Sequence, residues 1–461
     1  MSYTVDTAAY DDRLGRALLY REAGKVTQSL GLIYNAYLPG AGIGSICRII
    51  PSGVKADQAL DDSGIEAEVI GFKDNQVVLM PFEDASGVNN DSLVVLKQRS
   101  SVVKVGSTLL GRILDARGVP IDGKGPLGPM SERGLYHRPS HPLERQMVDQ
   151  PLDLGVRAIN GLLTVGRGQR VGIMAGSGVG KSVLLGMMAR HTAADVNVIA
   201  LIGERGREVR EFIERDLGPE GLARSVVVVA TSDKSPLLRM RGAFMASSIA
   251  EHFRDEGKDV LLMMDSVTRF CMAQREIGLS LGEPPASKGY TPSVFSTLPK
   301  LLERAGTGVG KGSITGIYTV LVDGDDMDDP VADSARSILD GHIVLSRKFA
   351  ARNHFPAIDV LASASRVMRA VTDKAHQGWA GQMREWMALY AQAEDLINIG
   401  AYNKGANPKI DQAIAVHERI QGFLKQGIDE RAGYADTLGA MHAISRAAEA
   451  FAAQPATGNS R

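Results

Sequence analysis

The sequence predicts an α/β protein in which a mostly parallel sheet follows a small β-barrel or sandwich and precedes a helical region. Short runs rich in Val, Ile and Leu fill residues 25–96, whereas residues 165–345 alternate between buried-strand and helical patterns. The strand patterns stop beyond about residue 371. Strands buried on both faces read as continuous apolar runs, so their alternation with helices indicates a parallel sheet covered on both sides.

We expect four segments along the chain. An amphipathic helix lies within residues 1–24, a β-barrel spans 25–96, the α/β region spans 97–370 and a helical domain spans 371–461. A chain of 461 residues is too long for one compact core, which agrees with this division.

The first segment has apolar residues at helical spacing. Tyr10, Leu14, Ala17 and Leu18 recur with charged residues between them, which predicts a short amphipathic helix. Its apolar stripe has three alternative roles: packing on its own domain, binding a partner protein, or lying on a membrane surface.

The barrel region contains a recognisable hairpin. Residues 66–72 and 76–81 are strand-like and flank the turn residues 73–75. Several strands of this kind within about 70 residues are typical of a small barrel or sandwich.

The α/β region and the helical domain differ in periodicity. Buried strands are expected at residues 169–174, 196–202, 225–230, 260–264, 313–322 and 342–345. Apolar residues then recur at helical spacing over 386–397 and 410–424.

Composition excludes several classes of protein. Apolar residues make up 44% and the net charge is −1, so no global positive field would attract nucleic acid. The two cysteines, Cys47 and Cys271, are too few for a disulfide framework, which favours a reducing cytosol. The polar start, residues 1–13, excludes a secretory signal, and the apolar runs at 226–230 and 260–264 are too short to cross a bilayer. We expect a soluble cytoplasmic protein.

Residues 175–182 form a P-loop between a strand and a helix. The motif consists of Ala175, Gly176, Ser177, Gly178, Val179, Gly180, Lys181 and Ser182. Its glycines let backbone N–H groups surround phosphates, and the following helix adds its positive N-terminal dipole. Lys181 is expected to neutralise the β- and γ-phosphates of ATP, and the Ser182 hydroxyl to ligate Mg²⁺. The alternative is a glycine-rich turn without a ligand.

A near-repeat of this motif lies at residues 305–312. Its last position is Gly312, which has no hydroxyl for a metal ion, and it leads from a helix into a strand. No helix dipole would face the loop, so we interpret it as a flexible connection.

Two carboxylates follow buried strands and complete the predicted phosphate site. Asp265 ends an apolar strand in the manner of a Walker B motif, and it would hold the Mg²⁺ shell. Glu204 follows the strand at 196–202 and is a candidate for the group that activates water. Arg205 would then contact the phosphates. The alternative for Glu204 is a surface ion pair with Arg205 or Arg207.

With these residues in place, positions 25–414 resemble the catalytic ATPase of flagellar and other type III protein-export systems, relatives of the rotary ATP synthase β subunit. The motifs that carry the resemblance lie at residues 175–182, 203–205, 265–269, 282–285, 289–290, 298–304 and 312–318. The resemblance implies a RecA-like P-loop NTPase core at 97–370, between an N-terminal β-barrel and a C-terminal helical domain. It also implies a homohexameric ring with ATP sites at the subunit interfaces.

The resemblance also assigns roles to individual residues. It implies that Glu204 activates water, that Arg205 lies next to it and that Arg269 organises the site after the Walker B strand. Arg366 matches the arginine finger that reaches the γ-phosphate of a neighbouring subunit, which would make activity depend on assembly. Phe355 matches an aromatic residue that stacks on adenine, and its alternative is a core residue.

Two features place the chain within the resembled family. Glu204 is absent from the non-catalytic subunits of rotary ATPases, so the chain resembles a catalytic member. Residues 395–402 are as in export ATPases, and the acidic motif expected there in the ATP synthase β subunit is missing. Export is therefore favoured over ATP synthesis, and the flagellar system over an injectisome.

The resemblance further implies partners and a location. These are export chaperones with their substrates, the export-gate membrane protein, a central stalk protein and a stator-like regulatory protein at the N-terminal helix. The enzyme would lie in the cytoplasm, peripheral at the inner-membrane export apparatus. The acidic loop at residues 323–329 would lie near the central stalk, with a solvated turn or a metal site as the alternatives.

Three other functions remain as alternatives. One is a subunit of a rotary ion pump, which needs non-catalytic partner chains. Another is an RNA motor of the Rho type, but its barrel should interleave aromatic and basic residues, and this barrel region has few aromatic residues. The last is a nucleotide-dependent assembly platform without an enzymatic role.

Overall fold

The computed structural model describes residues 23–52, 64–322 and 329–453, which form two compact units divided at Val102 and Val103. The predicted helix at residues 10–18 lies outside the described residues, and so does most of the acidic loop at 323–329. Each unit is described by itself.

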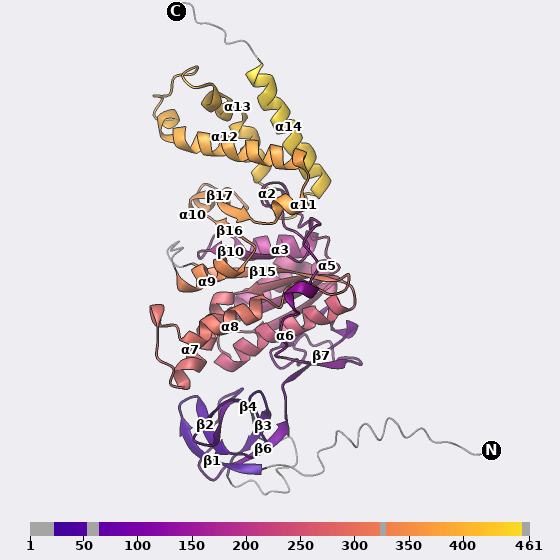
Figure 1. Ribbon diagram of the computed structural model, residues 1–461, viewed down its shortest axis with the longest axis vertical. Helices are drawn as coiled ribbons and strands as arrows, with labels where there is room; N and C mark the ends of the chain where they lie inside the picture. The colour runs from indigo at the N-terminus through magenta and orange to yellow at the C-terminus, as the bar shows by residue number, and fades with distance from the viewer. Residues whose placement is uncertain (1–22, 53–63, 323–328, 454–461) are drawn as a thin grey trace, which may run out of the picture. The chain divides into compact units, whose positions relative to one another are not determined.

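The first unit is a closed six-stranded barrel with the strand order β1-β2-β5-β4-β3-β6 (Figure 1). Its strands are β1 (Ala23–Leu30), β2 (Ile33–Tyr37), β3 (Ile46–Ile50), β4 (Ile65–Lys73), β5 (Gln76–Pro81) and β6 (Leu93–Gln98). The expected hairpin is β4 and β5, and its turn residues Asp74 and Asn75 have φ values of 48° and 63°. A two-residue turn with both φ values positive matches the twist of the strands. Because the six strands close on one another, the predicted alternative of a barrel is confirmed and that of a sandwich is wrong.

The second unit is built on a mostly parallel sheet in the order β17-β16-β10-β15-β13-β11-β12-β8, with β14 paired to β15. The strands are β8 (Arg112–Asp115), β10 (Arg170–Ala175), β11 (Val196–Ile202), β12 (Ser225–Ala230), β13 (Asp259–Asp265), β14 (Gly306–Thr307), β15 (Ser313–Leu321), β16 (Gly341–Leu345) and β17 (Ile358–Ser365). All six expected strands are present. The β16–β17 and β14–β15 pairs are antiparallel.

Helices cover both faces of this sheet. Helix α6 packs on β11, β12 and β13, and Figure 1 shows α3 on the opposite side. The helices are α2 (Arg157–Leu162), α3 (Lys181–His191), α4 (Gly206–Glu211), α5 (Gly218–Ala223), α6 (Pro236–Asp255), α7 (Val267–Ser280), α8 (Pro292–Leu302), α9 (Pro330–Ile338), α10 (Arg347–Ala351) and α11 (Met368–Val371). A π-helical turn, Phe212–Leu217, joins α4 to α5.

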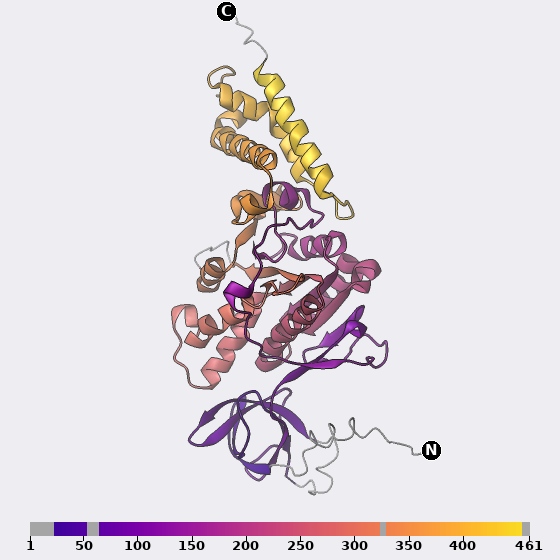
Figure 2. The ribbon, with the colours of Figure 1, turned by 45° about the vertical axis from the view of Figure 1, so that its right-hand side comes forward.

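The chain ends in three helices that lie side by side in both views (Figures 1 and 2). They are α12 (Lys374–Asn398), α13 (Pro408–Leu424) and α14 (Tyr434–Ala452), and all three pack on α2. Phe423 and Met441 approach α2 at Gly161, where an added Cβ would lie 3.0 Å and 2.8 Å from their side chains. The glycine therefore permits this close contact.

The strand order brings three chemically important turns to one edge of the sheet. The P-loop follows β10, Glu204 follows β11, and Asp265 ends β13. Because these strands are parallel, their carboxyl ends lie at the same edge. Residues far apart in the sequence can therefore form one site.

Candidate functional site

The P-loop has the strand–loop–helix geometry of a phosphate cradle. It leaves β10 at Ala175 and enters α3 at Lys181. Gly178 and Gly180 have φ values of 78° and 86°, a region that favours glycine. The backbone N–H groups at the start of α3 face the loop, which suits an anion.

Lys181 lies between the two predicted carboxylates. Its Nζ atom is 2.5 Å from Oδ1 of Asp265 and 3.6 Å from Oε1 of Glu204. All three side chains are largely buried, at 12%, 5% and 15% exposure respectively. Asp265 is also fixed by the Thr319 hydroxyl, which donates to Oδ1 at 2.7 Å. The sequence prediction that Asp265 lies beside the P-loop is confirmed.

The electrostatics of this cluster shift two pKa values. Burial lowers the pKa of Lys181, but the charges of Asp265 and Glu204 outweigh it, and the net pKa is raised. The lysine is therefore charged. Burial, followed by the negative charge of Asp265, raises the pKa of Glu204 to about 7. A carboxyl group with this pKa can exchange a proton near neutral pH.

The alternative of a surface ion pair for Glu204 is wrong. Arg205 pairs with Glu208 at 3.6 Å and Arg207 pairs with Glu211 at 2.9 Å. Oε1 of Glu204 is buried and has no hydrogen-bond partner among the residues that the structure describes. An unsatisfied buried acceptor is costly, and here it faces a pocket that can hold water or a ligand.

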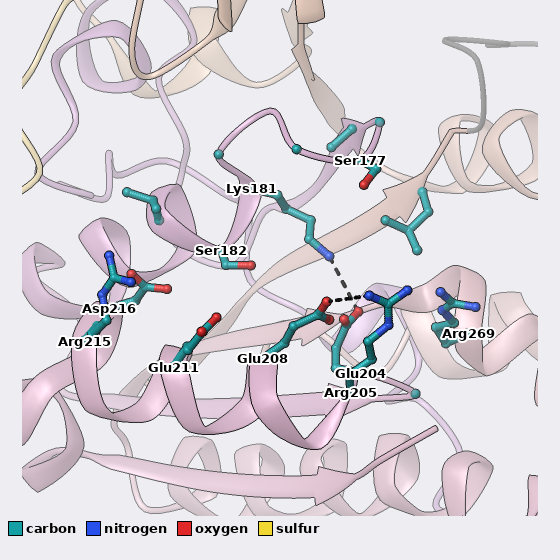
Figure 3. A pocket seen from close by; sticks show the side chains of 17 residues that line it. Ser177, Lys181, Ser182, Glu204, Arg205, Glu208, Glu211, Arg215, Asp216 and Arg269 are labelled. Atoms are coloured by element: carbon teal, nitrogen blue, oxygen red, sulfur yellow. Dashed lines mark ion pairs between the residues drawn. The ribbon is translucent and has the colours of Figure 1, made fainter. Parts of the chain in front are cut away.

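The pocket beside Lys181 has a volume of about 450 Å³. Figure 3 shows Lys181 extending toward Glu204, with Glu208 and Glu211 along the adjacent helix. The sequence-predicted residues in its lining are Gly176, Ser177, Gly178, Gly180, Lys181, Ser182, Glu204, Arg205 and Arg269. Val179 is buried.

The two sequence-predicted arginines of this pocket, Arg205 and Arg269, differ in accessibility. The Arg205 side chain is 81% exposed and pairs with Glu208. Arg269 packs against Gly203, where an added Cβ would lie 2.6 Å from its side chain. Its Nε atom is buried without a partner in the described part of the chain. Arg269 thus presents an unused donor at a site suited to phosphate.

Phe355 lies at a second, adjoining pocket of about 640 Å³. Its side chain is 41% exposed, so the alternative of a core residue is wrong. The pocket lining is Gly178, Gly180, Val183, Leu184, Met187, Asn353, Phe355, Pro356, Lys425, Gln426, Gly427 and Ile428. A largely apolar pocket that shares two P-loop glycines with the phosphate site suits the base of a nucleotide.

Arg366 is not part of either pocket. It follows β17, is exposed, and donates through Nη1 to the Leu339 carbonyl at 3.2 Å and through Nη2 to the Arg336 carbonyl at 3.3 Å. These bonds cap the end of helix α9. The structure therefore does not bring Arg366 to the P-loop of its own chain.

Two family models match the chain. The nucleotide-binding domain of the ATP synthase alpha/beta family matches residues 155–365, and the T3SS EscN ATPase C-terminal domain matches residues 372–443. The chain is 50% identical over 426 residues to the flagellum-specific ATP synthase of Bacillus subtilis (strain 168), covering 92% of this chain and 96% of that protein. It belongs to the flagellar and type III secretion ATPase family. The enzyme is therefore an ATPase, and its nucleotide domain is that of the ATP synthase family.

Relatives of this export ATPase include both flagellar and secretion proteins. The type 3 secretion system ATPase of Sinorhizobium fredii (strain NBRC 101917 / NGR234) is 49% identical over 422 residues, with 92% of each chain covered. A structure of the assembled ATPase EscN with its central stalk EscO, from the enteropathogenic E. coli type III secretion system, matches with a TM-score of 0.83. Its identity is 47%, and the match covers 91% of this chain and 99% of that one. Such similar identities do not separate the two systems.

The phosphate site of the export ATPase has the chemistry that Mg²⁺ prefers. Ser182 and Asp265 supply a hydroxyl and a carboxylate, and the unsatisfied Oε1 of Glu204 lies nearby. No group of three or more His, Cys, Asp or Glu side chains suited to a metal occurs in residues 23–52, 64–322 or 329–453. Mg²⁺ commonly takes one or two protein oxygens and completes its shell with water and phosphate, so the residues fit a nucleotide-bound ion.

The near-repeat at residues 305–312 is confirmed as a connection. Its residues Gly306–Thr307 form β14, which turns back on β15, and Gly308 donates to the Gly312 carbonyl at 3.2 Å. No helix follows the loop. It begins after α8 and lies at the amino end of β15, opposite the edge that carries the P-loop.

The structure adds residues that sequence reasoning missed. Glu208, Glu211, Arg215 and Asp216 line the phosphate pocket, and the segment 425–428 lines the base pocket. Glu208 could have been found from the sequence, since it lies only four residues after Glu204, in the first helical segment that follows it. Glu211, Arg215 and Asp216 continue the same helical segment, whereas residues 425–428 come from more than 200 residues later and no sequence pattern indicated them.

No helix within residues 23–52, 64–322 and 329–453 is long and apolar enough to cross a membrane.

Proposed function

We propose that this ATPase hydrolyses Mg·ATP as a homohexamer and thereby energises type III protein export. The observation that carries the catalytic part is the buried cluster of Lys181, Glu204 and Asp265 beside the P-loop. Arg366 lies outside the pocket of its own chain, which supports a site completed by a neighbouring subunit.

Each residue has a specific task in this proposal. Lys181 and the P-loop amides bind the β- and γ-phosphates, so Lys181 exchanges its carboxylate partners for phosphate oxygens. Glu204, then free of the lysine, accepts hydrogen bonds from water through Oε1 and takes up a proton during attack. Ser182 and Asp265 would hold Mg²⁺, which supplies charge neutralisation at the phosphates. Arg269 donates to the phosphate oxygens.

Arg366 is proposed to act in trans. Fingers supplied by a second protein raise rates by about 10³–10⁵ in related phosphoryl transfer. Its exposure after the edge strand β17 makes it accessible to a second copy. The bonds that it now makes to the end of α9 are to backbone carbonyls, and assembly would replace them.

Steady-state ATPase activity against protein concentration tests the proposal. We expect the specific activity to rise with concentration, Arg366→Ala and Lys181→Ala to be inactive alone, and an equimolar mixture to recover part of the activity. Recovery requires an intact Lys181 and an intact Arg366 from different chains at one site. Activity that is independent of concentration, with a harmless Arg366→Ala, would overturn the shared-site proposal.

We also propose that hydrolysis releases export substrates from chaperones and engages the export-gate membrane protein. The match of residues 372–443 to an export-type C-terminal domain supports this role over a rotary ion pump. EscN is solved with its central stalk EscO, which supports a stalk partner here. A stator-like partner at the N-terminal helix and a peripheral position at the inner membrane remain predictions.

The export proposal is tested in cells that lack their own flagellar or secretion ATPase. Expression of this chain should restore swimming in the flagellar strain more fully than secretion in the other, as the flagellar prediction requires. A Glu204→Gln variant should restore neither function. Full restoration by that variant would favour an assembly platform over an export motor.

A further inference from the structure

The base pocket has a rim that comes from the end of the C-terminal helical region. Helix α13 ends at Leu424, and the next residues, 425–428, line the same pocket as Phe355. The backbone N–H of Gln426 donates to the Phe355 carbonyl at 3.0 Å. The position of this segment therefore sets the width of the base pocket.

A side chain of the P-loop helix holds this rim. Arg190 lies in the last turn of α3, and its Nη2 atom donates to the Ile428 carbonyl at 2.7 Å. The Arg190 side chain is 15% exposed, and its Nη1 atom donates to the Asp216 carbonyl. Hydrogen bonds from a charged donor to a carbonyl are stronger than neutral ones. Arg190 thus joins the rim to the wall of the phosphate pocket.

The other end of the rim is fixed from α2. Arg157 donates to the Phe423 carbonyl at 2.9 Å and to the Lys425 carbonyl at 2.6 Å. These carbonyls belong to the end of α13, where no intrahelical donor remains. Gln426, which is buried, donates to the Gly155 carbonyl at 2.8 Å. At the other end of the 425–428 segment, the hydrogen bond from Arg190 to the Ile428 carbonyl connects the segment to α3.

We propose that Arg190 is a positioning residue that holds the 425–428 segment against the nucleotide base. One helix then serves both parts of the ligand, since its first turn binds the phosphates and its last turn fixes the base pocket about 13 Å away. The inference deepens the proposed function and rests on the assignment of ATP to these two pockets. The C-terminal helical region thereby influences nucleotide affinity, because hydrogen bonds to its backbone set the position of the 425–428 segment.

The test compares a nucleotide with a ligand that has no base. Calorimetric titration of the full chain with Mg·ADP and with Mg·tripolyphosphate is made for the parent and for Arg190→Ala. We expect the Kd for ADP to rise about tenfold, as for loss of a charged hydrogen bond, while the Kd for tripolyphosphate stays within twofold. In hydrolysis, KM should rise more than kcat falls.

Two further variants keep the test decisive. Asp429 is 99% exposed and lies 3.8 Å from Arg190, so Asp429→Asn should leave both affinities unchanged. Arg190→Lys keeps the charge but lacks the fork that reaches two carbonyls, and its ADP affinity should lie between parent and Ala. If Arg190→Ala does not fold, the Lys variant is the comparison.

Several outcomes would overturn the inference. Equal losses for ADP and tripolyphosphate would mean that Arg190 acts on the phosphate pocket. Unchanged ADP affinity in the Arg190 variants, or a matching loss in Asp429→Asn, would also contradict it. If ATP does not bind in these two pockets, the proposed function itself fails. That outcome is distinguishable, because Lys181→Ala would then leave the Kd for tripolyphosphate unchanged.

Discussion

Nζ of Lys181 lies 2.5 Å from Oδ1 of Asp265, so the cation that we propose to bind phosphate is already paired within the chain. Both groups are largely buried, and Glu204 is a second carboxylate 3.6 Å away. Removing one partner of a buried ion pair leaves an uncompensated charge, which is strongly destabilising. Nucleotide binding must therefore compete with an internal counterion, and the lysine stabilises the nucleotide-free fold.

The first prediction concerns the stability of Lys181→Met. Its free energy of unfolding without nucleotide should fall by about 3 kcal/mol, because Asp265 and Glu204 remain buried without their cation. Urea denaturation followed by circular dichroism measures the change. The exposed Lys311 of the near-repeat loop offers a matched control, and Lys311→Met should keep both stability and ATPase activity. A stable Lys181→Met protein would show that water already screens the two carboxylates.

The second prediction concerns Glu204→Gln. The amide keeps the size of the side chain but cannot take a proton from water, so kcat should fall about 10²–10⁴-fold. The Kd for ATP should stay the same or decrease, because a negative charge near the phosphates is removed. Single-turnover hydrolysis and equilibrium ATP binding separate the two effects. A variant with normal kcat would remove Glu204 from the catalytic role.

The third prediction is a pH dependence that follows from the pKa of Glu204, which burial and Asp265 raise to about 7. A general base acts in its deprotonated form, so kcat/KM should decline as the pH falls below about 7. The pH dependence of the free energy of unfolding has the opposite direction to that of kcat/KM. A carboxyl group whose pKa is raised in the folded state favours the fold most at a pH below its ordinary pKa of 4.5. That contribution is lost as the pH rises through about 7.

A substitution at Glu208 tests the cause of this pH dependence. The interaction with Glu204 lowers the pKa of Glu208, and the same interaction contributes to raising the pKa of Glu204, after the larger effects of burial and of Asp265. Glu208→Gln should therefore move the acidic limb of the kcat/KM profile to lower pH. A limb that does not move in Glu208→Gln, and persists in Glu204→Gln, would belong to another group.

The central strands were predictable because each is buried on both faces. Strands β11 and β12 occupy the same residues as expected, 196–202 and 225–230, and every residue of both is buried. Strand β8 was missed because it has only four residues and lies at the sheet edge, where it is half-exposed. An edge strand covered on one face has no continuous apolar run, so its sequence resembles a turn.

The site was predictable where function depends on local backbone geometry. The P-loop, Glu204 and Asp265 each lie at or just beyond the carboxyl end of a buried strand, so parallel topology alone places them together. No comparable sequence pattern indicated the rim of the base pocket, because it does not follow a buried strand. Residues 425–428 contribute carbonyl groups that Arg157 and Arg190 hold from elements more than 200 residues earlier. Contacts to backbone atoms place almost no constraint on the residue type that makes up the rim.

The fourth prediction assigns a structural role to Arg304, which ends the motif at residues 298–304. Arg304 donates to Glu251 through Nε at 2.7 Å and Nη2 at 2.8 Å, and the side chains are 1% and 3% exposed. Arg304→Ala should lower the free energy of unfolding by about 3–5 kcal/mol. The exposed pair of Arg210 and Glu214 is the control, and Arg210→Ala should cost less than about 1 kcal/mol. Equal effects in denaturation would contradict the assignment.

The last prediction concerns the contribution of Phe355 to base binding. Its half-exposed ring borders the pocket next to Gly180 of the P-loop, where an added Cβ would lie 3.5 Å from the ring. Stacking of an aromatic ring on a base is worth about 1–3 kcal/mol. Phe355→Ala should therefore raise the Kd for ADP about 5- to 150-fold and leave tripolyphosphate binding unchanged, whereas Phe355→Tyr should bind both normally. Because the exposed ring contributes little to the core, thermal stability should change much less than affinity. An unchanged ADP affinity in Phe355→Ala would mean that the base lies elsewhere, and the proposed rim at 425–428 would then have no ligand to hold.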